Sequence, residues 1–301
     1  MAALFLGASS IGFAPIFLRY SEVGPSATAM YRVLLAAPLF WTLLWRRQRR
    51  PSPPRQPATA HEFRLLIVTG VFFALDLSLW HWSITMTTVS NATLLANLAP
   101  LVVTAGAWLL LKEPVTRQFL LAMMVAFVGA FLLMGASARF ARENLPGDAL
   151  ALFTALFYAA YQLWVKRLRL RFDPITILAW TGIPAVIGFL LIALLLNEKL
   201  VPDTAQGWAT LLGLALVSQF LGQGSIAYAF GHLPASFTSL SLLWQPMVAT
   251  AVAWILFGEF LRPIQFLGAA TLMAGLLIAN KDAVTRAAKR SQAPPGGSHK
   301  T

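Results

Sequence analysis

The chain has 301 residues, of which 58% are hydrophobic and only 11% are charged, and its mean hydropathy is +0.69. A soluble domain carries about 25% charged residues, so this composition excludes a soluble helical bundle. The net charge of +12 does not indicate a nucleic acid partner, because the basic residues flank apolar runs and form no groove with interleaved aromatics. Cysteine is absent, which excludes disulfides and thiolate metal sites. We expect no metal and no other cofactor.

The apolar runs are continuous, and each is close to the ~20 residues that a helix needs to cross a bilayer. A transmembrane barrel would instead alternate apolar and polar residues in segments of about ten. The sequence therefore predicts an all-α polytopic membrane protein with ten transmembrane helices. The expected spans are Ala2–Leu18, Ser26–Trp45, Phe63–Thr85, Ala92–Leu111, Phe119–Ser137, Gly147–Val165, Pro174–Leu196, Gly207–Phe230, Phe237–Phe257 and Ile264–Ala279.

Basic residues are distributed unevenly between the expected loops. Most of the 23 lie in the loops after the second, fourth and sixth spans and in the C-terminal tail. The loop after the second span alone contains Arg46, Arg47, Arg49, Arg50, Arg55 and Arg64. Because Lys and Arg are retained in the cytoplasm, we predict cytoplasmic N- and C-termini in a bacterial inner membrane. The same residues are expected to attract anionic membrane lipid.

One set of residues recurs later in the chain at a constant spacing. Pro100, Trp108, Glu113 and Gly129 are repeated as Pro246, Trp254, Glu259 and Gly275. Five spans per half is an odd number, so the second half would enter the membrane with opposite polarity, as an inverted 5+5 repeat. Transporters with such repeats carry their substrate site near the midplane, where the halves meet. The expected parts are a first repeat (1–138), a connecting loop (139–146), a second repeat (147–282) and a disordered cytoplasmic tail (283–301).

Three stretches carry a family resemblance. They are Ala8–Arg32 (ASSIGFAPIFLRYSEVGPSATAMYR), Asp76–Trp82 and Asn91–Pro100, followed by the glutamates that end spans 4 and 9. In these residues the chain resembles the EamA-type branch of the drug/metabolite transporter superfamily, over essentially its whole length. The resemblance implies ten helices, an inverted repeat and export of amino acids or other small metabolites. The aromatic-rich character is similar to that of exporters of aromatic amino acids.

Polar side chains inside a span are costly toward lipid, so they tend to face the protein interior or a cavity. Span 3 contains Asp76 and His81, which lie about 140° apart on a helix. We interpret His81 as a ligand for a substrate carboxylate or ring, or as a proton relay. The alternative is a satisfied interfacial histidine beside Trp82. Asp76 is expected to couple protons or to pair with Arg32.

Aromatic and amide side chains recur on single faces of the later spans, at i, i+3 and i+4. Amides bind charged groups and rings stack, so this lining would suit a zwitterion with an apolar side chain. The alternative is hydrogen bonding between helices, worth about 0.6 kcal/mol per contact. The expected lining comprises His81, Trp82, Asn97, Tyr158, Tyr161, Gln162, Trp164, Gln219, Gln223, Tyr228, Trp244 and Gln245.

Two prolines fall inside equivalent spans. Pro100 and Pro246 each remove one helical hydrogen bond, which predicts a hinge or a bend needed only for packing. Glu113 and Glu259 end the same spans, and we expect them to clamp the following turns. A stripe of alanines in span 5, at positions 122, 126 and 130, predicts close helix packing or a contact between chains. We therefore expect a monomer or a weak homodimer.

These features favour an alternating-access exporter of a small molecule, with amino acids bearing aromatic or apolar side chains as the preferred substrates. The alternatives are export of drugs, nucleotide-sugars or other metabolites. A nucleotide-linked substrate would need several cations, and the spans offer only Arg32. A remote alternative is an intramembrane enzyme using Ser9 or Ser10 with His81. No nucleophile elbow or HExxH motif supports it, so we do not expect an enzyme.

Overall fold

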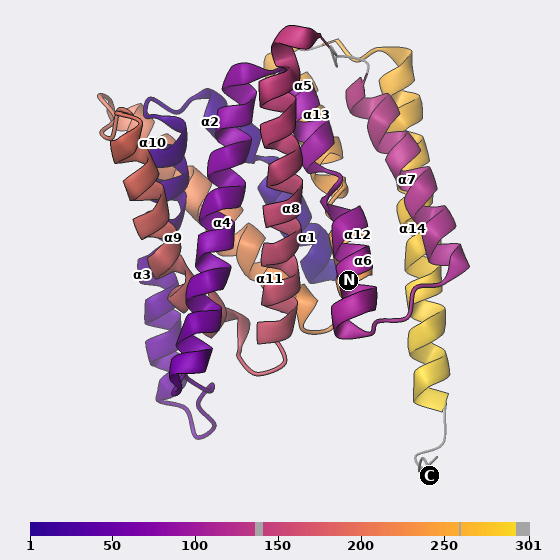
Figure 1. Ribbon diagram of the computed structural model, residues 1–301, viewed down its shortest axis with the longest axis horizontal. Helices are drawn as coiled ribbons and strands as arrows, with labels where there is room; N and C mark the ends of the chain where they lie inside the picture. Colours follow the sequence, from indigo (N-terminus) through magenta and orange to yellow (C-terminus); the bar gives the residue numbers. More distant parts are fainter. Residues whose placement is uncertain (136–140, 259, 293–301) are drawn as a thin grey trace.

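A computed structural model describes residues 1–135, 141–258 and 260–292. This part of the chain contains helices and no strand. Ten of its helical stretches are long and apolar enough to cross a membrane, and they lie side by side in one bundle (Figure 1). The predicted all-α, ten-span membrane fold is confirmed.

Several spans consist of more than one helix. The first is α1 (Ala2–Gly12) with α2 (Ala14–Arg19), followed by α3 (Pro25–Gln48) and α4 (Ala60–Met86). Next come α5 (Val89–Ala96) with α6 (Ala99–Leu111), α7 (Arg117–Gly135), the 3-10 turn η1 (Arg142–Asn144) with α8 (Leu145–Leu168), and α9 (Pro174–Leu195). The last three are α10 (Ala205–Gly213), the π-helix η2 (Leu214–Gln223) and α11 (Gly224–Phe230), then α12 (Ala235–Ser241) with α13 (Trp244–Phe257), then α14 (Pro263–Gln292).

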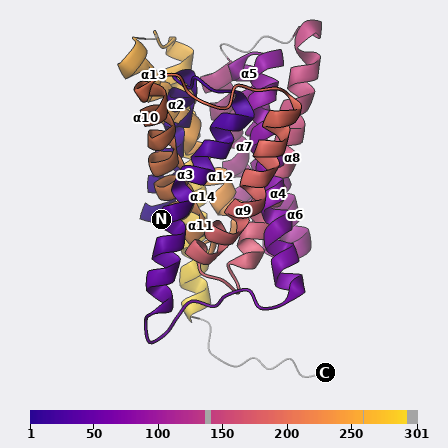
Figure 2. The same ribbon diagram turned by 90° about the vertical axis from the view of Figure 1, so that its left-hand side faces the viewer.

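The bundle has two chemically different ends. We call the end where α3 and α8 finish the basic face, because the basic segments 46–50 and 166–171 lie there. The opposite end, where α3 and α8 begin, is the distal face. At the basic face, Arg47 forms an ion pair with Asp173 at 2.9 Å, which joins the end of α3 to the start of α9. These two helices also pack along their length (Figure 2).

Local sequence signals set the helix boundaries. Thr59 and Glu62 form a capping box at the start of α4, and Asp173 caps α9 just ahead of Pro174. Two spans end on a left-handed residue at the same place in each half. Lys112 follows α6 with φ +53°, and Gly258 follows α13 with φ +63°. Of the two, only Gly258 is a glycine, which adopts this conformation without steric cost.

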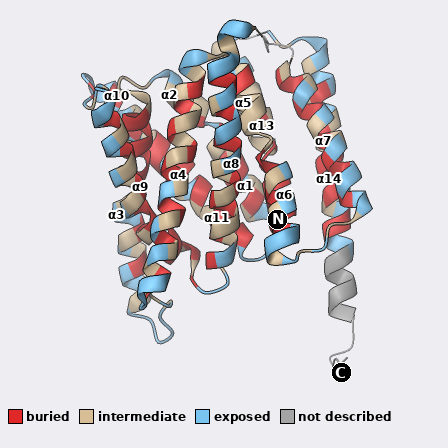
Figure 3. Cartoon of the chain, viewed as in Figure 1, coloured by how far each residue is buried: buried red, intermediate tan, exposed pale blue. Residues whose placement is uncertain are grey.

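The outer surface of the bundle is apolar. Leu110, Leu195 and Ile255 are 74%, 78% and 72% exposed, whereas many of the buried residues are small or aromatic. The buried parts of the helices face the inside of the bundle (Figure 3). A soluble monomer rarely exposes so much contiguous apolar surface. These side chains are therefore placed to contact lipid.

Spans 4 and 9 are each broken in the middle, just ahead of the repeated prolines. The break between α5 and α6 falls at Asn97–Leu98, and that between α12 and α13 at Leu242–Leu243. At both breaks the backbone closes tighter i→i+3 turns, such as the one from Leu98 N–H to the Leu95 carbonyl. Each proline then sits in the first turn of the new helix, where its missing N–H costs least.

One boundary differs from the sequence-based expectation. α14 continues to Gln292, past the point at which we placed the start of the tail, because residues such as Ala283, Ala287 and Ala288 favour helix. The remainder of the tail and the expected clamp Glu259 lie outside the described residues. So do residues 139 and 140 of the expected connecting loop.

The tightest packing joins α7 to α14. The backbone at Gly129 lies against Leu272, and the backbone at Gly275 lies against Ala126. Leu272 and Ala126 occupy equivalent positions in the expected repeat, as do Gly129 and Gly275. Each contact is therefore the counterpart of the other, with the roles of the two halves interchanged. The small residues of span 5 are thus used within the chain for close helix approach.

A methyl group at Gly129 should disrupt this contact. The added Cβ would lie 2.2 Å from the Leu272 nitrogen, so backbone must move, at a cost of about 1–3 kcal/mol. We expect Gly129→Ala to lower the thermal unfolding temperature in detergent. Gly135→Ala is the matched control on the same helix, because its Cβ would meet only the Phe131 ring at 3.5 Å. Equal unfolding temperatures for the two variants would contradict this packing.

Candidate functional site

A cavity of about 130 Å³ lies where the two halves of the chain meet. One water requires ~10–15 Å³ on this measure, so the space holds roughly ten waters, or one small metabolite in their place. Its wall is formed by Ile11, Gly12, Ala14, Pro15, Arg32, Phe73, Asp76, Leu77, Trp80, Thr93, Ala96, Asn97, Thr154, Tyr158, Gln223, Gln245, Pro246 and Ala249. Both halves therefore contribute to one chamber.

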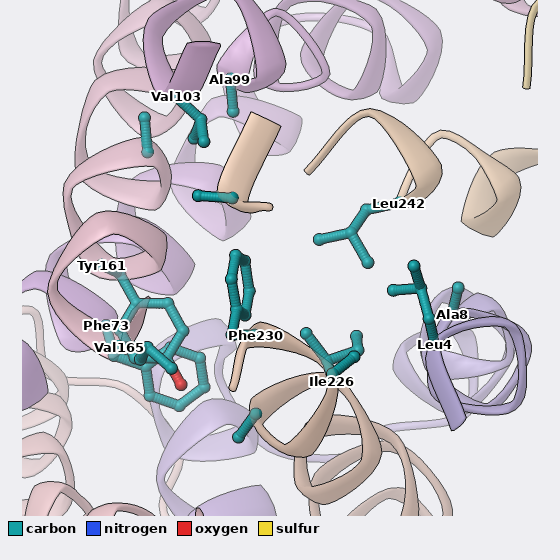
Figure 4. Packing of buried hydrophobic residues seen from close by; sticks show 14 of the residues in the cluster. Leu4, Ala8, Phe73, Ala99, Val103, Tyr161, Val165, Ile226, Phe230 and Leu242 are labelled. Carbon is teal, nitrogen blue, oxygen red and sulfur yellow. The ribbon is translucent and has the colours of Figure 1, made fainter. Parts of the chain in front are cut away.

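The cavity lies in the distal half of the bundle. Asp76 and Trp80 belong to the distal part of α4, and Thr93 lies on α5, which begins at the distal face. Toward the basic face the interior is filled by an aromatic plug, which we define as Phe73, Tyr161 and Phe230 (Figure 4). The Phe73 and Tyr161 rings stack at 4.8 Å. Tyr161 and Phe230 are each 1% exposed, so both side chains are packed inside the protein.

Opposite charges face the cavity from two helices. Arg32 on α3 and Asp76 on α4 are each 5% exposed and both line the wall. Arg32 Nε donates to Gln219 Oε1 at 3.0 Å, and among the described residues no ion pair joins Arg32 to Asp76. A buried charge is costly unless it is paired or hydrogen-bonded. Asp76 and most of the Arg32 guanidinium thus remain available to a solute.

The rest of the wall is aromatic and amide in character. Phe73, Trp80 and Tyr158 supply ring surface, while Asn97, Gln223 and Gln245 supply amides. Gln223 donates to the Tyr161 hydroxyl at 2.8 Å, which fixes its orientation. The Gln245 amide nitrogen is buried and makes no hydrogen bond of ordinary geometry, although its side chain interacts with Tyr158. An unsatisfied buried donor costs about 1–3 kcal/mol, so this group is poised for a ligand or water.

The helix breaks meet at this cavity. Asn97 caps α5, Gln245 and Pro246 begin α13, and Gly12 ends α1. Helix ends carry backbone groups without intrahelical partners. Non-helical backbone at membrane depth is tolerated where it borders a cavity, as it does here.

Seven of the residues singled out from the sequence line the cavity: Arg32, Asp76, Asn97, Tyr158, Gln223, Gln245 and Pro246. Tyr161 is part of the aromatic plug, and both it and the adjacent Gln162 are buried. Gln219 acts behind the wall, where it holds Arg32. Thus these residues of α8 and of the π-helix η2 point inward.

Other predicted residues lie elsewhere. His81 Nδ1 is 2.7 Å from the Pro25 carbonyl, so it contacts the start of α3, and neither it nor Trp82 lines the cavity. Trp244 donates to Ser9 Oγ at 2.9 Å and so joins α13 to α1. Tyr228 is 48% exposed beside His232. The spacing of residues along a helix shows which of them share a face. It does not show whether that face points to lipid, to a neighbouring helix or to the cavity.

Other wall residues were not singled out from the sequence. Phe73 lies three residues before Asp76, and Thr154 lies four residues before Tyr158, so helical spacing alone would have placed them on the same faces. Trp80 and Thr93 also line the cavity. These residues carry no charge, which is why a search for unusual polar groups passes over them.

An ionic contact closes the interior at the basic face. The Glu113 carboxylate accepts hydrogen bonds from the Ala235 N–H at 2.8 and 3.0 Å, at the start of α12. Lys166 lies 3.7 Å from the same carboxylate and donates to the Phe230 and Leu233 carbonyls. We call Glu113, Lys166 and Ala235 the basic-face latch, because they join spans 4, 6 and 9. Of the two repeated prolines, Pro246 lines the cavity, whereas Pro100 is buried and is not among the wall residues.

Polar groups lie buried on the closed side of the plug. Both polar atoms of the Gln162 amide and the Ser239 hydroxyl have no hydrogen-bond partner, and the two residues are 1% and 0% exposed. Each such group costs about 1–3 kcal/mol. Water entering from the basic face would relieve that cost.

The described residues include no group of three His, Asp or Glu side chains that could hold a metal ion. They also contain no hydrogen bond between Ser10 and His81, the pair considered for an enzyme. The arrangement is that of a binding chamber with opposite charges and ring surfaces.

Comparisons with known proteins agree with this architecture. The model of the EamA-like transporter family matches residues 1–135 and 145–281. A solved crystal structure superimposes with a TM-score of 0.78 at 17% identity, covering 94% of this chain and 95% of the other, which shows a shared fold.

Three curated relatives are transporters by name. The pseudopaline exporter CntI of Pseudomonas aeruginosa is 26% identical over 65% of this chain and 67% of its own length. A probable amino-acid metabolite efflux pump of Salmonella typhimurium is 28% identical over 61% and 67%. A riboflavin transporter of Vibrio cholerae is 24% identical over 73% and 72%. The chain is a multi-pass membrane transporter that belongs to the EamA-like transporter family.

Proposed function

We propose that this protein exports small zwitterionic metabolites, with amino acids bearing aromatic or apolar side chains as the preferred class. The observation that carries the proposal is the pair of buried opposite charges, Arg32 and Asp76, which face one chamber without binding each other. A solute carboxylate would bind the Arg32 guanidinium, and its ammonium would bind Asp76. Bound together, these charges satisfy one another in a medium of low dielectric constant.

The remaining wall supports an aromatic or apolar side chain on that solute. Phe73, Trp80 and Tyr158 present ring surface to the chamber, and Leu77 adds an aliphatic contact. Ring stacking contributes about 0.5–1.5 kcal/mol beyond the area that is buried. Two relatives, named an amino-acid metabolite efflux pump and a pseudopaline exporter, support metabolite export as the direction of transport.

A second candidate is export of an uncharged aromatic metabolite. The ring-lined chamber and the relative named a riboflavin transporter favour it. Nucleotide-sugars and other phosphorylated compounds fit less well, because Arg32 is the one cation among the residues of the wall. The two leading candidates differ in what they require of the chamber: a zwitterionic solute would bind both Arg32 and Asp76, whereas an uncharged aromatic solute would need neither charge.

We infer an alternating-access mechanism, with the basic face in the cytoplasm of a bacterial cell and an inverted repeat relating the halves. The positive charge at the basic face supports that orientation. The contacts Gly129–Leu272 and Gly275–Ala126 correspond to each other when the two halves are interchanged, which supports the repeat. The conformation described would then face outward, with the chamber reached from the distal face and the aromatic plug and basic-face latch closed.

Counterflow in proteoliposomes tests the substrate class. Vesicles loaded with unlabelled phenylalanine should accumulate labelled phenylalanine, tryptophan or tyrosine from outside. The controls are vesicles that contain the protein but no unlabelled phenylalanine, and vesicles without protein. Movement of a polar metabolite, with none of the three aromatic amino acids moving, would contradict the proposed class. Repeating the assay with an imposed pH gradient separates proton coupling from facilitated diffusion.

Neutralising either charge should weaken substrate binding. A hydrogen bond to a charged group is worth about 1.5–3 kcal/mol, so we expect Arg32→Gln and Asp76→Asn each to raise the KM for counterflow by about 10- to 100-fold. Tyr228→Phe is the control, since Tyr228 lies outside the chamber and should leave the KM unchanged. A normal KM in both charge variants would favour the uncharged aromatic substrate.

Breaking the basic-face latch should shift the protein toward the opposite state. The chain has no cysteine, so single cysteines report accessibility without background. We expect Glu113→Gln to speed thiol labelling of Ser239→Cys, now fully buried, and to slow labelling of Thr93→Cys in the chamber wall. Ala185→Cys, equally buried on α9, controls for general loosening. Faster labelling at all three positions would contradict alternation.

A further inference from the structure

A second, larger hollow lies on the lipid-exposed side of the bundle at the basic face. It measures about 780 Å³ and runs between α6 and α8, with Phe72 of α4 behind them. We call it the lateral groove. Its walls are apolar, with Leu110, Leu163 and Trp164 among them, and Leu110 is 74% exposed. An apolar groove at membrane depth must be filled by lipid or protein, because water there would be unfavourable.

The mouth of the groove carries a positive charge. Arg167 lies at the rim near the end of α8, and its guanidinium lies 5.3 Å from the centre of the Trp164 ring. No carboxylate within the described part of the chain forms an ion pair with Arg167. Lys166 also lines the groove, but it is engaged by Glu113 and by two backbone carbonyls. Arg167 is therefore the cation available to an anion outside the protein.

We propose that the lateral groove binds an anionic phospholipid, with one acyl chain along Leu110, Leu163 and Phe72 and the headgroup phosphate on Arg167. The order of chemistry along the groove matches that of a lipid, since apolar wall, amphipathic tryptophan and cation follow one another toward the basic face. Basic pockets between transmembrane helices on the cytoplasmic side are suited to such headgroups. The assignment of the groove to the cytoplasmic leaflet rests on the orientation proposed above. The lipid site itself is independent of that orientation.

The groove also borders the basic-face latch, because Glu113 and Lys166 line both. A bound headgroup beside Lys166 would compete with Glu113 for that cation. Lipid occupancy would thereby change how readily the basic face opens, without any contact with the chamber.

Fluorescence quenching by brominated lipids tests the site without any transported solute. The purified full chain is placed in phosphatidylcholine vesicles that contain brominated phosphatidylglycerol or, at the same fraction, brominated phosphatidylcholine. The difference between the wild-type protein and Trp164→Phe isolates the quenching of Trp164. We expect the brominated anionic lipid to quench Trp164 more strongly than the brominated zwitterionic lipid.

Substitutions at the rim then test the headgroup contact. Arg167→Gln should reduce the preference for the anionic lipid about fivefold, which corresponds to about 1 kcal/mol per basic residue at an anionic surface. Arg167→Lys should retain most of it, which shows that the charge matters and that the site remains folded. Arg117→Gln, an exposed arginine on the same face outside the groove, is the matched control and should change nothing. Equal quenching of Trp164 by both lipids, or an equal loss in the Arg117 variant, would overturn the proposal.

Discussion

The cost of holding a charge inside a membrane governs this structure. Arg32 and Asp76 are both buried at membrane depth, and they form no direct ion pair with each other. Such residues persist in membrane proteins where they face a water-filled space or a ligand. The chamber is the space that makes them tolerable, and the chemistry of its walls follows from them. Gln219 accepts a hydrogen bond from the cation, and the rings of Phe73 and Trp80 line the same chamber.

The two ends of the chamber are built differently. On the distal side, broken helices leave backbone and amide groups around open space. On the basic side, the aromatic plug and the basic-face latch close the interior, but Gln162 and Ser239 remain buried without partners. The closed half therefore stores a cost that hydration would release.

The sequence predicts the class of fold well, because hydropathy and length decide it. The ten spans follow from composition and hydropathy, and the breaks in spans 4 and 9 lie near Pro100 and Pro246. The lining is harder to predict. His81 and Tyr228 have the residue types of a binding site, yet one contacts the Pro25 carbonyl and the other lies 48% exposed. Thr154 is an inconspicuous residue that lines the chamber. Which side chains line the chamber depends on how each helix is rotated about its own axis. Tertiary packing sets that rotation.

The central claim is that one solute binds both charges of the chamber at once. The most direct measurement is competition by matched analogues against counterflow of labelled phenylalanine. Phenylalanine itself has both charges, 3-phenylpropanoate lacks the ammonium, and phenethylamine lacks the carboxylate. We predict that unlabelled phenylalanine competes at least tenfold better than either analogue, the factor expected when one charge-assisted hydrogen bond of about 1.5–3 kcal/mol is lost. Equal competition by either analogue would contradict the two-charge site.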